Sequence, residues 1–297
     1  MKIAVTTPTG HIGSKLANIL LERKSEITVI ARHPEKVKDL ARRGAKVIAG
    51  EHNDPAIVEQ AVQGADALFW LTPAEMTSHD PLADARRMAD AGASVLRQNP
   101  NLRVVQLSSA GAFLPSGTGP IVGLHYTEEK FRAAGKNIVS LRPNEFMENV
   151  FFSLPTITTQ GSIYGSVPGS MRAPFIATQD IAEVAADFLL KPKNGHYIVD
   201  IVGPEERSFD DVAELIGQAI GKTVRYVTIP GEKFKEALVQ VGASREMADL
   251  FVEMEAASPN IMGKFLGDEK RTGKITYRQF ARDVFAPAYK KAIETAA

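Results

Sequence analysis

The stretch from Lys2 to Ala17 constrains the fold of this chain more than any other part of the sequence. It reads KIAVTTPTGHIGSKLA: a short apolar run, a turn carrying Gly10 and Gly13, and a segment whose apolar residues recur every three or four positions. That order predicts a strand, a glycine-containing loop and a helix. Glycine lets the backbone approach a pyrophosphate, and the helix N-terminus offers free N–H groups and a positive dipole end to the anion. The stretch therefore predicts a phosphate-binding loop.

The loop departs from the usual glycine spacings. Thr7 stands where a Gly-x-x-Gly-x-x-Gly pattern has its first glycine, and Pro8 stands where Gly-x-Gly-x-x-Gly has one. Pro8 also removes a backbone N–H from the loop. We expect a side chain at Gly13 to block dinucleotide binding without unfolding the protein. An ordinary strand-to-helix turn without a ligand is the alternative.

Segments typical of strands and of helices alternate along the first half of the chain. Short apolar runs indicate strands at residues 26–31, 46–49, 67–71, 103–107 and 138–141. Helical patterns lie between them, at residues 34–43, 54–62, 84–96 and 126–134. This alternation predicts an α/β fold of the Rossmann type, with a doubly wound parallel sheet.

The rhythm changes after Asn149. Helical patterns occur at residues 180–190, 208–219, 233–241, 245–256 and 277–291, and strand patterns at residues 195–202 and 223–229. Ser208, with Asp211 three positions later, is typical of a helix start. We therefore predict an NAD(P)-binding domain over residues 1–152 and a smaller C-terminal α/β lobe for substrate or partner over residues 153–297. Some segments of the second part should return to the Rossmann sheet.

Composition excludes several classes of function. Lys and Arg number 35, as do Asp and Glu, so no global field attracts nucleic acid or an acidic membrane. The absence of cysteine excludes disulfides and thiolate catalysis, and we expect no metal site. No run of about 18 apolar residues occurs, so we predict neither a signal peptide nor a membrane span. The default location for such a chain is the cytoplasm.

A doubly wound sheet binds ligands beyond the carboxyl ends of its strands. The residues expected there, and hence to contact a dinucleotide, are Thr7, Thr9, Gly10, His11, Ile12, Gly13, Arg32, Glu51, Leu71, Thr72, Pro73, Ser108, Ser109, Pro143, Asn144 and Phe146. Arg32 lies where an NAD-binding domain usually has an acid for the ribose 2′-hydroxyl. Because an arginine suits a 2′-phosphate instead, it favours NADP(H) over NAD(H). A solvated surface arginine is the alternative.

Several further motifs carry a resemblance to a known family. They are TTPTGHIG, ARHPEKVKDL, GEHNDPAIVEQAVQGADALFWLTP, VVQLSSAGA, EEKFRAAGKNIVSLRPNEFMENVF, RAPFIATQDIAEVAADFLL and GPEERSFDDVAELIGQAIGKTVRYVTIP. With them the chain resembles the NmrA-like branch of the atypical short-chain dehydrogenases/reductases over nearly its whole length. The resemblance implies either an NADPH-dependent reductase of quinones, dyes and related acceptors or a non-catalytic dinucleotide sensor that binds a regulatory protein. A homodimer stays open, and direct binding of nucleic acid is not expected.

Tyr126 and Lys130 match the Tyr-x-x-x-Lys spacing with which enzymes of this superfamily supply a proton. Leu124, Phe131 and Gly135, however, share a face of the predicted helix nearly opposite to the pair. We therefore expect Tyr126 and Lys130 to point away from the sheet, as a solvated pair. His125 lies near the edge of the apolar face, so it is a candidate for either a pocket rim or a surface position.

A substrate pocket is expected from the residues that follow the last strand of the first domain. Phe146, Met147, Asn149, Phe151 and Phe152 could line an apolar pocket over the nicotinamide, or could form ordinary core between the two parts. A quinone is electrophilic enough for water to supply the proton after hydride transfer. The sequence thus favours NADPH-dependent reduction of a quinone-like acceptor, with the sensor as the alternative.

Overall fold

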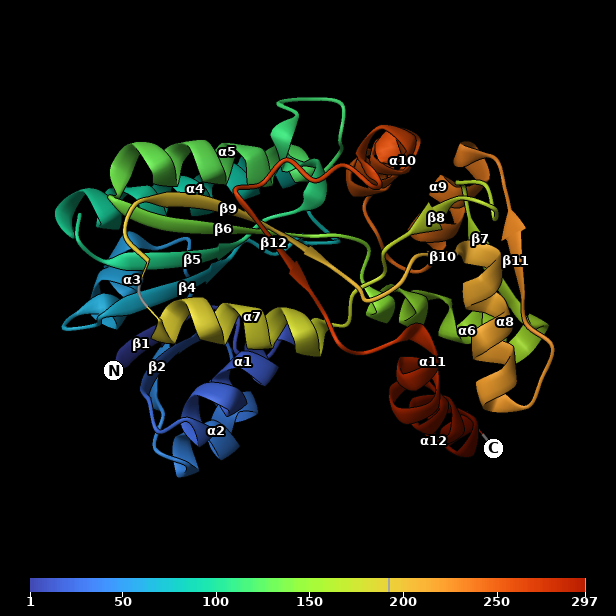
Figure 1. Cartoon of the computed structure of the whole chain (residues 1–297), viewed down its shortest axis with the longest axis horizontal. Coiled ribbons are helices and arrows are strands. Elements are labelled where there is room, and N and C mark those ends of the chain that lie inside the picture. Colours follow the sequence, from blue (N-terminus) through green and yellow to red (C-terminus); the bar gives the residue numbers. More distant parts are fainter. Residues whose placement is uncertain (192, 297) are drawn as a thin grey trace.

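The computed structural model describes residues 1–191 and 193–296 and is built around a sheet of eight parallel strands (Figure 1). The sheet has the spatial order β12-β9-β6-β5-β4-β1-β2-β3. The strands are β1 (Lys2–Val5), β2 (Glu26–Ala31), β3 (Lys46–Ala49), β4 (Ala67–Leu71), β5 (Arg103–Leu107), β6 (Asn137–Pro143), β9 (His196–Val202) and β12 (Glu269–Thr272). The chain runs outward from β1 to β3 and then returns to β4 on the other side of β1. This reversal confirms the predicted doubly wound sheet and puts the topological switch point between β1 and β4.

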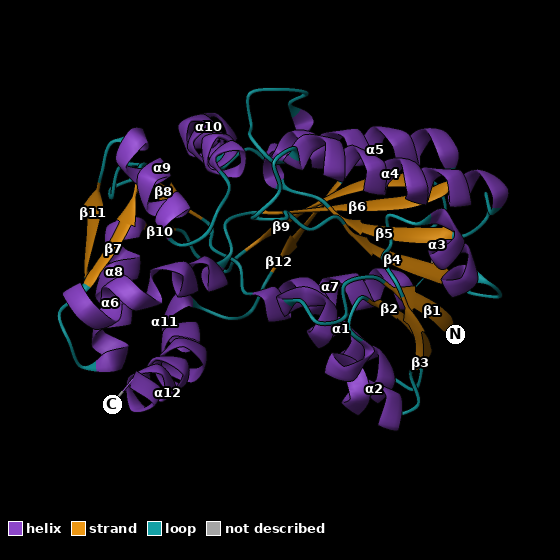
Figure 2. Cartoon of the chain, turned by 180° about the vertical axis from the view of Figure 1, so that it is seen from behind, coloured by secondary structure: helices purple, strands orange, loops and turns teal. Residues whose placement is uncertain are grey.

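Helices cover both faces of the sheet (Figure 2). One face carries α1 (His11–Glu22) and α7 (Thr178–Leu190), which pack against each other. The other face carries α3 (Pro55–Val62), α4 (Pro81–Gln98) and α5 (Ile121–Ala134). Because both faces are covered, central strands such as β4 read as continuous apolar runs rather than as alternating ones.

The second half of the chain contributes to two places. The helix α7 and the strands β9 and β12 lie with the main sheet. A second lobe has its own core of aromatic and aliphatic side chains, including Phe175, Tyr277 and Phe280. Its elements are η3 (Met147–Ser153), α6 (Leu154–Gln160), β7 (Ser162–Gly165), β8 (Arg172–Ala173), β10 (Arg207–Ser208), α8 (Phe209–Ile220), β11 (Arg225–Thr228), α9 (Gly231–Gln240), α10 (Arg245–Ile261), α11 (Tyr277–Phe280), η4 (Ala281–Phe285) and α12 (Ala286–Ala296).

The structure corrects several expected element boundaries. The helix expected at residues 34–43 is a 3-10 turn, η1 (Pro34–Val37), followed by the short α2 (Lys38–Arg42). The helix expected at residues 277–291 is divided by the π-turn η4. The helix expected near Tyr126 begins at Ile121, where Gly123 allows α5 to approach Ala85 of α4 closely. The capping box between Ser208 and Asp211 is present as expected.

No helix within the described residues is both long and apolar enough to cross a membrane.

Candidate functional site

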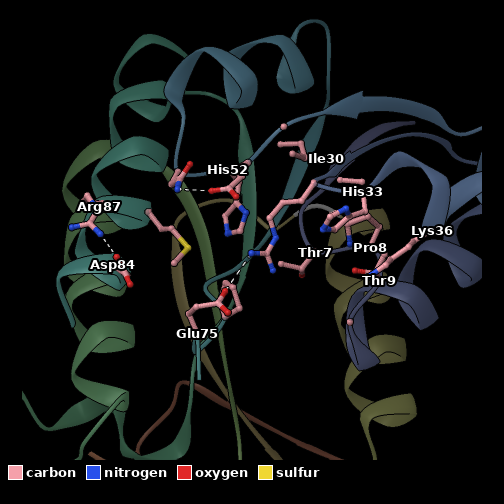
Figure 3. Close-up of a pocket in the computed structure, with 18 residues that line it drawn as sticks. Thr7, Pro8, Thr9, Ile30, His33, Lys36, His52, Glu75, Asp84 and Arg87 are labelled. Atoms are coloured by element: carbon pink, nitrogen blue, oxygen red, sulfur yellow. Dashed lines mark hydrogen bonds and ion pairs between the residues drawn. The ribbon is translucent and has the colours of Figure 1, made fainter. Parts of the chain in front are cut away.

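A pocket of about 480 Å³ lies at the carboxyl ends of β1, β2 and β3 (Figure 3). The loop after β4 and the start of α4 complete its wall. Its lining residues are Thr7, Pro8, Thr9, Gly10, Ile30, Ala31, Arg32, His33, Lys36, Gly50, Glu51, His52, Asn53, Pro73, Glu75, Asp84, Arg87 and Met88. This volume is within the usual range for small-molecule sites.

The loop between β1 and α1 presents backbone donors toward this pocket. Gly10 is the N-cap of α1, and the first helical hydrogen bond runs from the N–H of Ser14 to the carbonyl of Gly10 (3.0 Å). The N–H groups of His11, Ile12 and Gly13 precede that bond, so they are available to an anion. Thr7, with a positive φ of 51°, carries a buried hydroxyl with no partner among the described residues. The loop thus offers several unfilled donors at one helix end.

Gly13 is required by packing inside the protein. A Cβ at this position would lie 2.1 Å from the carbonyl oxygen of Thr7, which is backbone and belongs to the loop itself. The expectation that a side chain there would affect binding alone is therefore wrong. Gly10 differs, because a Cβ there would meet only the Thr7 carbonyl, at the ordinary distance of 3.5 Å.

Arg32 follows β2 directly and lines the pocket. Its Nη1 lies 3.3 Å from Oε2 of Glu75, and the two side chains are 58% and 44% exposed. His33, just before η1, and Lys36, within it, also line the pocket (Figure 3). Glu75 was not expected at the site, because it is held there by the loop after β4 and no local pattern relates it to Arg32.

His52 is a second residue that sequence reasoning missed. Burial lowers the pKa of its imidazole to about 4, so the ring is neutral at pH 7. The ring meets Trp70 edge to face, with centroids 5.1 Å apart, and its Nε2 has no partner among the described residues. The sequence signal that could have identified His52 is its position next to Glu51, in the loop that follows β3.

The predicted cofactor residues divide into two groups. Those that line the pocket are Thr7, Thr9, Gly10, Arg32, Glu51 and Pro73. The others lie at the start of α1 or along the same carboxyl edge, at the ends of β4, β5 and β6; they are His11, Ile12, Gly13, Leu71, Thr72, Ser108, Ser109, Pro143, Asn144 and Phe146. Thr6, directly after β1, links the ends of β1 and β4, because its hydroxyl accepts a hydrogen bond from the N–H of Leu71 (3.0 Å).

Ser108, directly after β5, forms a hydrogen bond with a buried ion pair. Its hydroxyl donates to Oε1 of Glu128 (2.5 Å), and Glu128 accepts from Nε (2.9 Å) and Nη2 (2.5 Å) of Arg142. Glu128 therefore lies on the buried face of α5, together with Thr127 and Phe131, whereas Leu124 is only half-buried. The expected inward face was wrong in part, because a charge can be buried when an opposite charge neutralises it.

Tyr126 and Lys130 lie on the outer side of α5, away from the pocket. The hydroxyl of Tyr126 donates to Oδ1 of Asp90 (3.0 Å), on α4, and the ammonium of Lys130 lies 3.4 Å from the same carboxylate oxygen. That ammonium is 4.9 Å from the centroid of the Tyr126 ring. Nδ1 of His125 donates to the carbonyl of Ala112 (2.9 Å).

The residues expected to line a substrate pocket are not brought together. Met147 is fully buried in the second-lobe core, and Phe151 packs on Phe280 and Phe285 there, so these two side chains are core rather than pocket wall. Phe152 is 72% exposed. Phe146 packs against the core of the main sheet, and the exposed Asn149 donates through its side-chain nitrogen to a neighbouring carboxylate.

Clusters of three or more His, Asp or Glu side chains that could hold a metal ion do not occur among the described residues.

Comparisons with known proteins agree with this geometry. Residues 8–192 match the NAD(P)H-binding family, and residues 125–265 match the NmrA-like family. An NAD(P)H azoreductase of Xenophilus azovorans is 28% identical over 94% of this chain and 96% of its own. An NADPH-dependent quinone oxidoreductase of Escherichia coli, solved with NADPH, has a TM-score of 0.75 at 21% identity and covers 95% of this chain and 99% of its own.

A further similar structure is that of NmrA, a negative transcriptional regulator solved with NADP. It has a TM-score of 0.71 at 16% identity and covers 98% of this chain and 97% of its own. Catalytic and regulatory proteins thus share the fold. The glycine loop, the parallel sheet and the family match over residues 8–192 agree: this chain belongs to the NAD(P)H-binding family, and its residues 125–265 match the NmrA-like family.

Proposed function

We propose that this protein is an NADPH-dependent reductase that delivers a hydride to a quinone-like or related small electrophilic acceptor. The observation that carries the proposal is the pocket at the ends of β1 to β3, with the N-terminus of α1 on one side and Arg32 on the other. The similarity to an azoreductase over almost the whole chain supports a reductase.

The residues of the pocket fit a phosphorylated dinucleotide. The free N–H groups of His11 to Gly13 and the unpartnered hydroxyl of Thr7 suit a pyrophosphate. Arg32 and Lys36 suit a 2′-phosphate. In the structure, the guanidinium of Arg32 is paired with Glu75. When bound, NADPH supplies the hydride, and these residues bind and orient it.

Replacing Arg32 with alanine should weaken NADPH binding by about 1–3 kcal/mol, the range for losing a charged hydrogen bond, and leave NADH binding nearly unchanged. The reason is that only NADPH carries the 2′-phosphate. Fluorescence titration of both nucleotides measures the effect. Arg87→Ala is a matched control, because Arg87 lines the same pocket from α4 and not from the end of β2, where the 2′-phosphate is expected. An equal loss for NADH and NADPH in Arg32→Ala would contradict the assignment.

Replacing Tyr126 with phenylalanine should change turnover by less than about tenfold, whereas removal of a true general acid costs roughly 10²–10⁴-fold. The hydroxyl donates to Asp90 on the outer side of α5, so it does not reach the carboxyl edge of the sheet. Steady-state kinetics measures this. A loss in the larger range, with NADPH binding intact, would restore Tyr126 and Lys130 as the catalytic pair.

The deciding experiment for the function follows NADPH oxidation by absorbance, with a panel of quinones, azo compounds and triphenylmethane dyes as acceptors. We expect oxidation that depends on the acceptor. Tight NADPH binding without turnover on any acceptor would contradict the reductase and favour a sensor.

One contact favours that second candidate. Nζ of Lys15, on α1, lies 3.0 Å from Oε1 of Glu148, on η3. A dinucleotide bound at α1 could therefore alter the position of the second lobe and its affinity for a protein partner.

A further inference from the structure

Two carboxylates, Glu145 and Glu255, lie where the second lobe meets the main sheet. Glu145 comes two residues after β6, and Glu255 comes from α10. Glu255 accepts from both the N–H (2.7 Å) and the hydroxyl of Ser166. For Glu145, the described hydrogen bond is the one from the side-chain nitrogen of Asn149 (2.7 Å). Burial raises the pKa of Glu255 as well, but the hydrogen bonds from Ser166 oppose that rise, whereas Glu145 has fewer donors to oppose it.

The surroundings of Glu145 favour its protonated form. The pKa of the half-buried Glu145 is raised to about 7, mainly by loss of solvation; the hydrogen bond from Asn149 lowers it in part, and the negative charge of Glu255 acts in the raising direction. The other titratable groups that face it are Tyr226 of β11 and Tyr277 of α11, and burial raises the pKa of both phenols, so both keep their protons. Glu148, on η3, is held by Lys15. Two neighbouring carboxyls whose pKa values are raised to different extents can serve as an acid and as a negative charge that keeps the acid protonated.

The hydroxyl groups near this site are already committed as donors. Tyr226 donates to the carbonyl of Val167 (3.1 Å), and Tyr277 donates to the carbonyl of Met147 (3.5 Å). Ser108 donates to Glu128, and Tyr126 donates to Asp90 on the outer surface. Within the described residues, the carboxyl of Glu145 accepts from the side-chain nitrogen of Asn149, and a proton on its other oxygen would be free for transfer.

The position of Glu145 suits the reacting end of the dinucleotide. A dinucleotide lies across the switch point between β1 and β4. Since the proposed function assigns the phosphates and the adenosine to the pocket over β1 to β3, it places the nicotinamide half over the ends of β4, β5 and β6. Asn144, at the end of β6, is 6% exposed and has a buried Oδ1 without a partner among the described residues. An orphaned acceptor of this kind indicates that a donor from a ligand or a water is missing at the same strand end.

We propose that Glu145 is the catalytic acid that protonates the acceptor, and that Glu255 is a positioning residue that keeps the proton on Glu145. The proposal rests on the proposed reductase function and replaces the expectation that water supplies the proton. For a quinone, the hydride and its electron pair go from C4 of the nicotinamide to the acceptor. The O–H bond of Glu145 breaks, its proton goes to the acceptor oxygen, and solvent returns a proton to Glu145. The sum is NADPH, a proton and a quinone giving NADP⁺ and a hydroquinone.

The chemistry of the acceptors provides an internal control. A quinone needs a proton as well as a hydride, whereas a cationic triphenylmethane dye is neutralised by the hydride alone at its central carbon. Comparing the two in one enzyme separates loss of an acid from general damage to the site. At about pH 6, which is below the raised pKa of Glu145, a protonated glutamate and a glutamine are both neutral, so the variant keeps the charge of the wild type.

The test compares wild type with Glu145→Gln at about pH 6, with NADPH affinity measured separately. We expect the ratio of quinone turnover to dye turnover to fall by roughly 10²-fold, the effect of removing a general acid. In the wild type, quinone turnover should fall as the pH rises through about 7, because Glu145 then loses its proton. The Glu145→Gln variant should lack this falling limb of the pH profile. Glu255→Gln should keep the limb but move it to lower pH, because the negative charge that holds the proton on Glu145 is gone.

Each other outcome also decides the matter. An unchanged ratio and an unchanged pH limb in Glu145→Gln overturn the proposal, as does an equal loss with both acceptors. Should the wild type reduce the quinone but not the dye, the pH limb alone decides. Failure of the wild type with every acceptor is a failure of the proposed function itself, and it is seen without any variant.

Discussion

Replacing Arg142 with methionine is expected to destabilise the protein by about 3–5 kcal/mol, the cost of leaving a buried charge without its partner. Arg142 and Glu128 are 6% and 3% exposed, and they meet through two hydrogen bonds of 2.9 and 2.5 Å. Methionine fills a similar volume but leaves Glu128 with only the hydroxyl of Ser108 as a donor. Chemical denaturation measures the free energy of unfolding.

Two control variants make this result specific. Arg23→Met breaks exposed ion pairs with Glu183 and Asp187 and should cost no more than about 1 kcal/mol. Adding Glu128→Leu to Arg142→Met should recover much of the lost stability, because a buried ion pair can often be replaced by apolar side chains at small cost. Similar losses for Arg142→Met and Arg23→Met would show that the buried pair contributes no more than a surface one.

Replacing Gly13 with alanine is expected to destabilise the protein by about 3 kcal/mol, at the upper end of the range for overpacking, and to abolish NADPH binding. The new methyl group would lie 2.1 Å from the carbonyl oxygen of Thr7, and a backbone atom cannot rotate away as a flexible side chain does. The loop would have to move, and with it the donors at the start of α1. Thermal unfolding and NADPH titration together measure the two effects.

Gly10→Ala is the matched control in the same loop. Its methyl group meets only the Thr7 carbonyl, at 3.5 Å, so stability should change by less than about 1 kcal/mol, the scale of an N-cap change. NADPH binding should still weaken, because the methyl group projects where the pyrophosphate approaches the helix N-terminus. If Gly13→Ala unfolds no more easily than Gly10→Ala, the loop has another way to accommodate the side chain.

The sequence by itself determined the parallel sheet and the glycine loop. Apolar runs such as residues 67–71 are long enough for a strand and lack alternation, which indicates burial on both faces. Their spacing leaves room for one helix between successive strands, and this leads to the doubly wound order observed. Arg32 could also be placed, because its position follows from the end of β2 alone. These features depend on residues close together in the chain.

The tertiary structure decided what the charged side chains do. Glu128 and Arg142 are helix and strand residues whose burial becomes favourable only when the sheet brings them together. Glu75 meets Arg32 across 43 positions, and the charge of Glu255, on α10, acts on Glu145, just after β6. A local sequence pattern does not show which residue distant in the chain will be the partner of a charged side chain. The energy of a buried charge depends almost wholly on that partner, so the fold was predictable and the roles of these carboxylates were not.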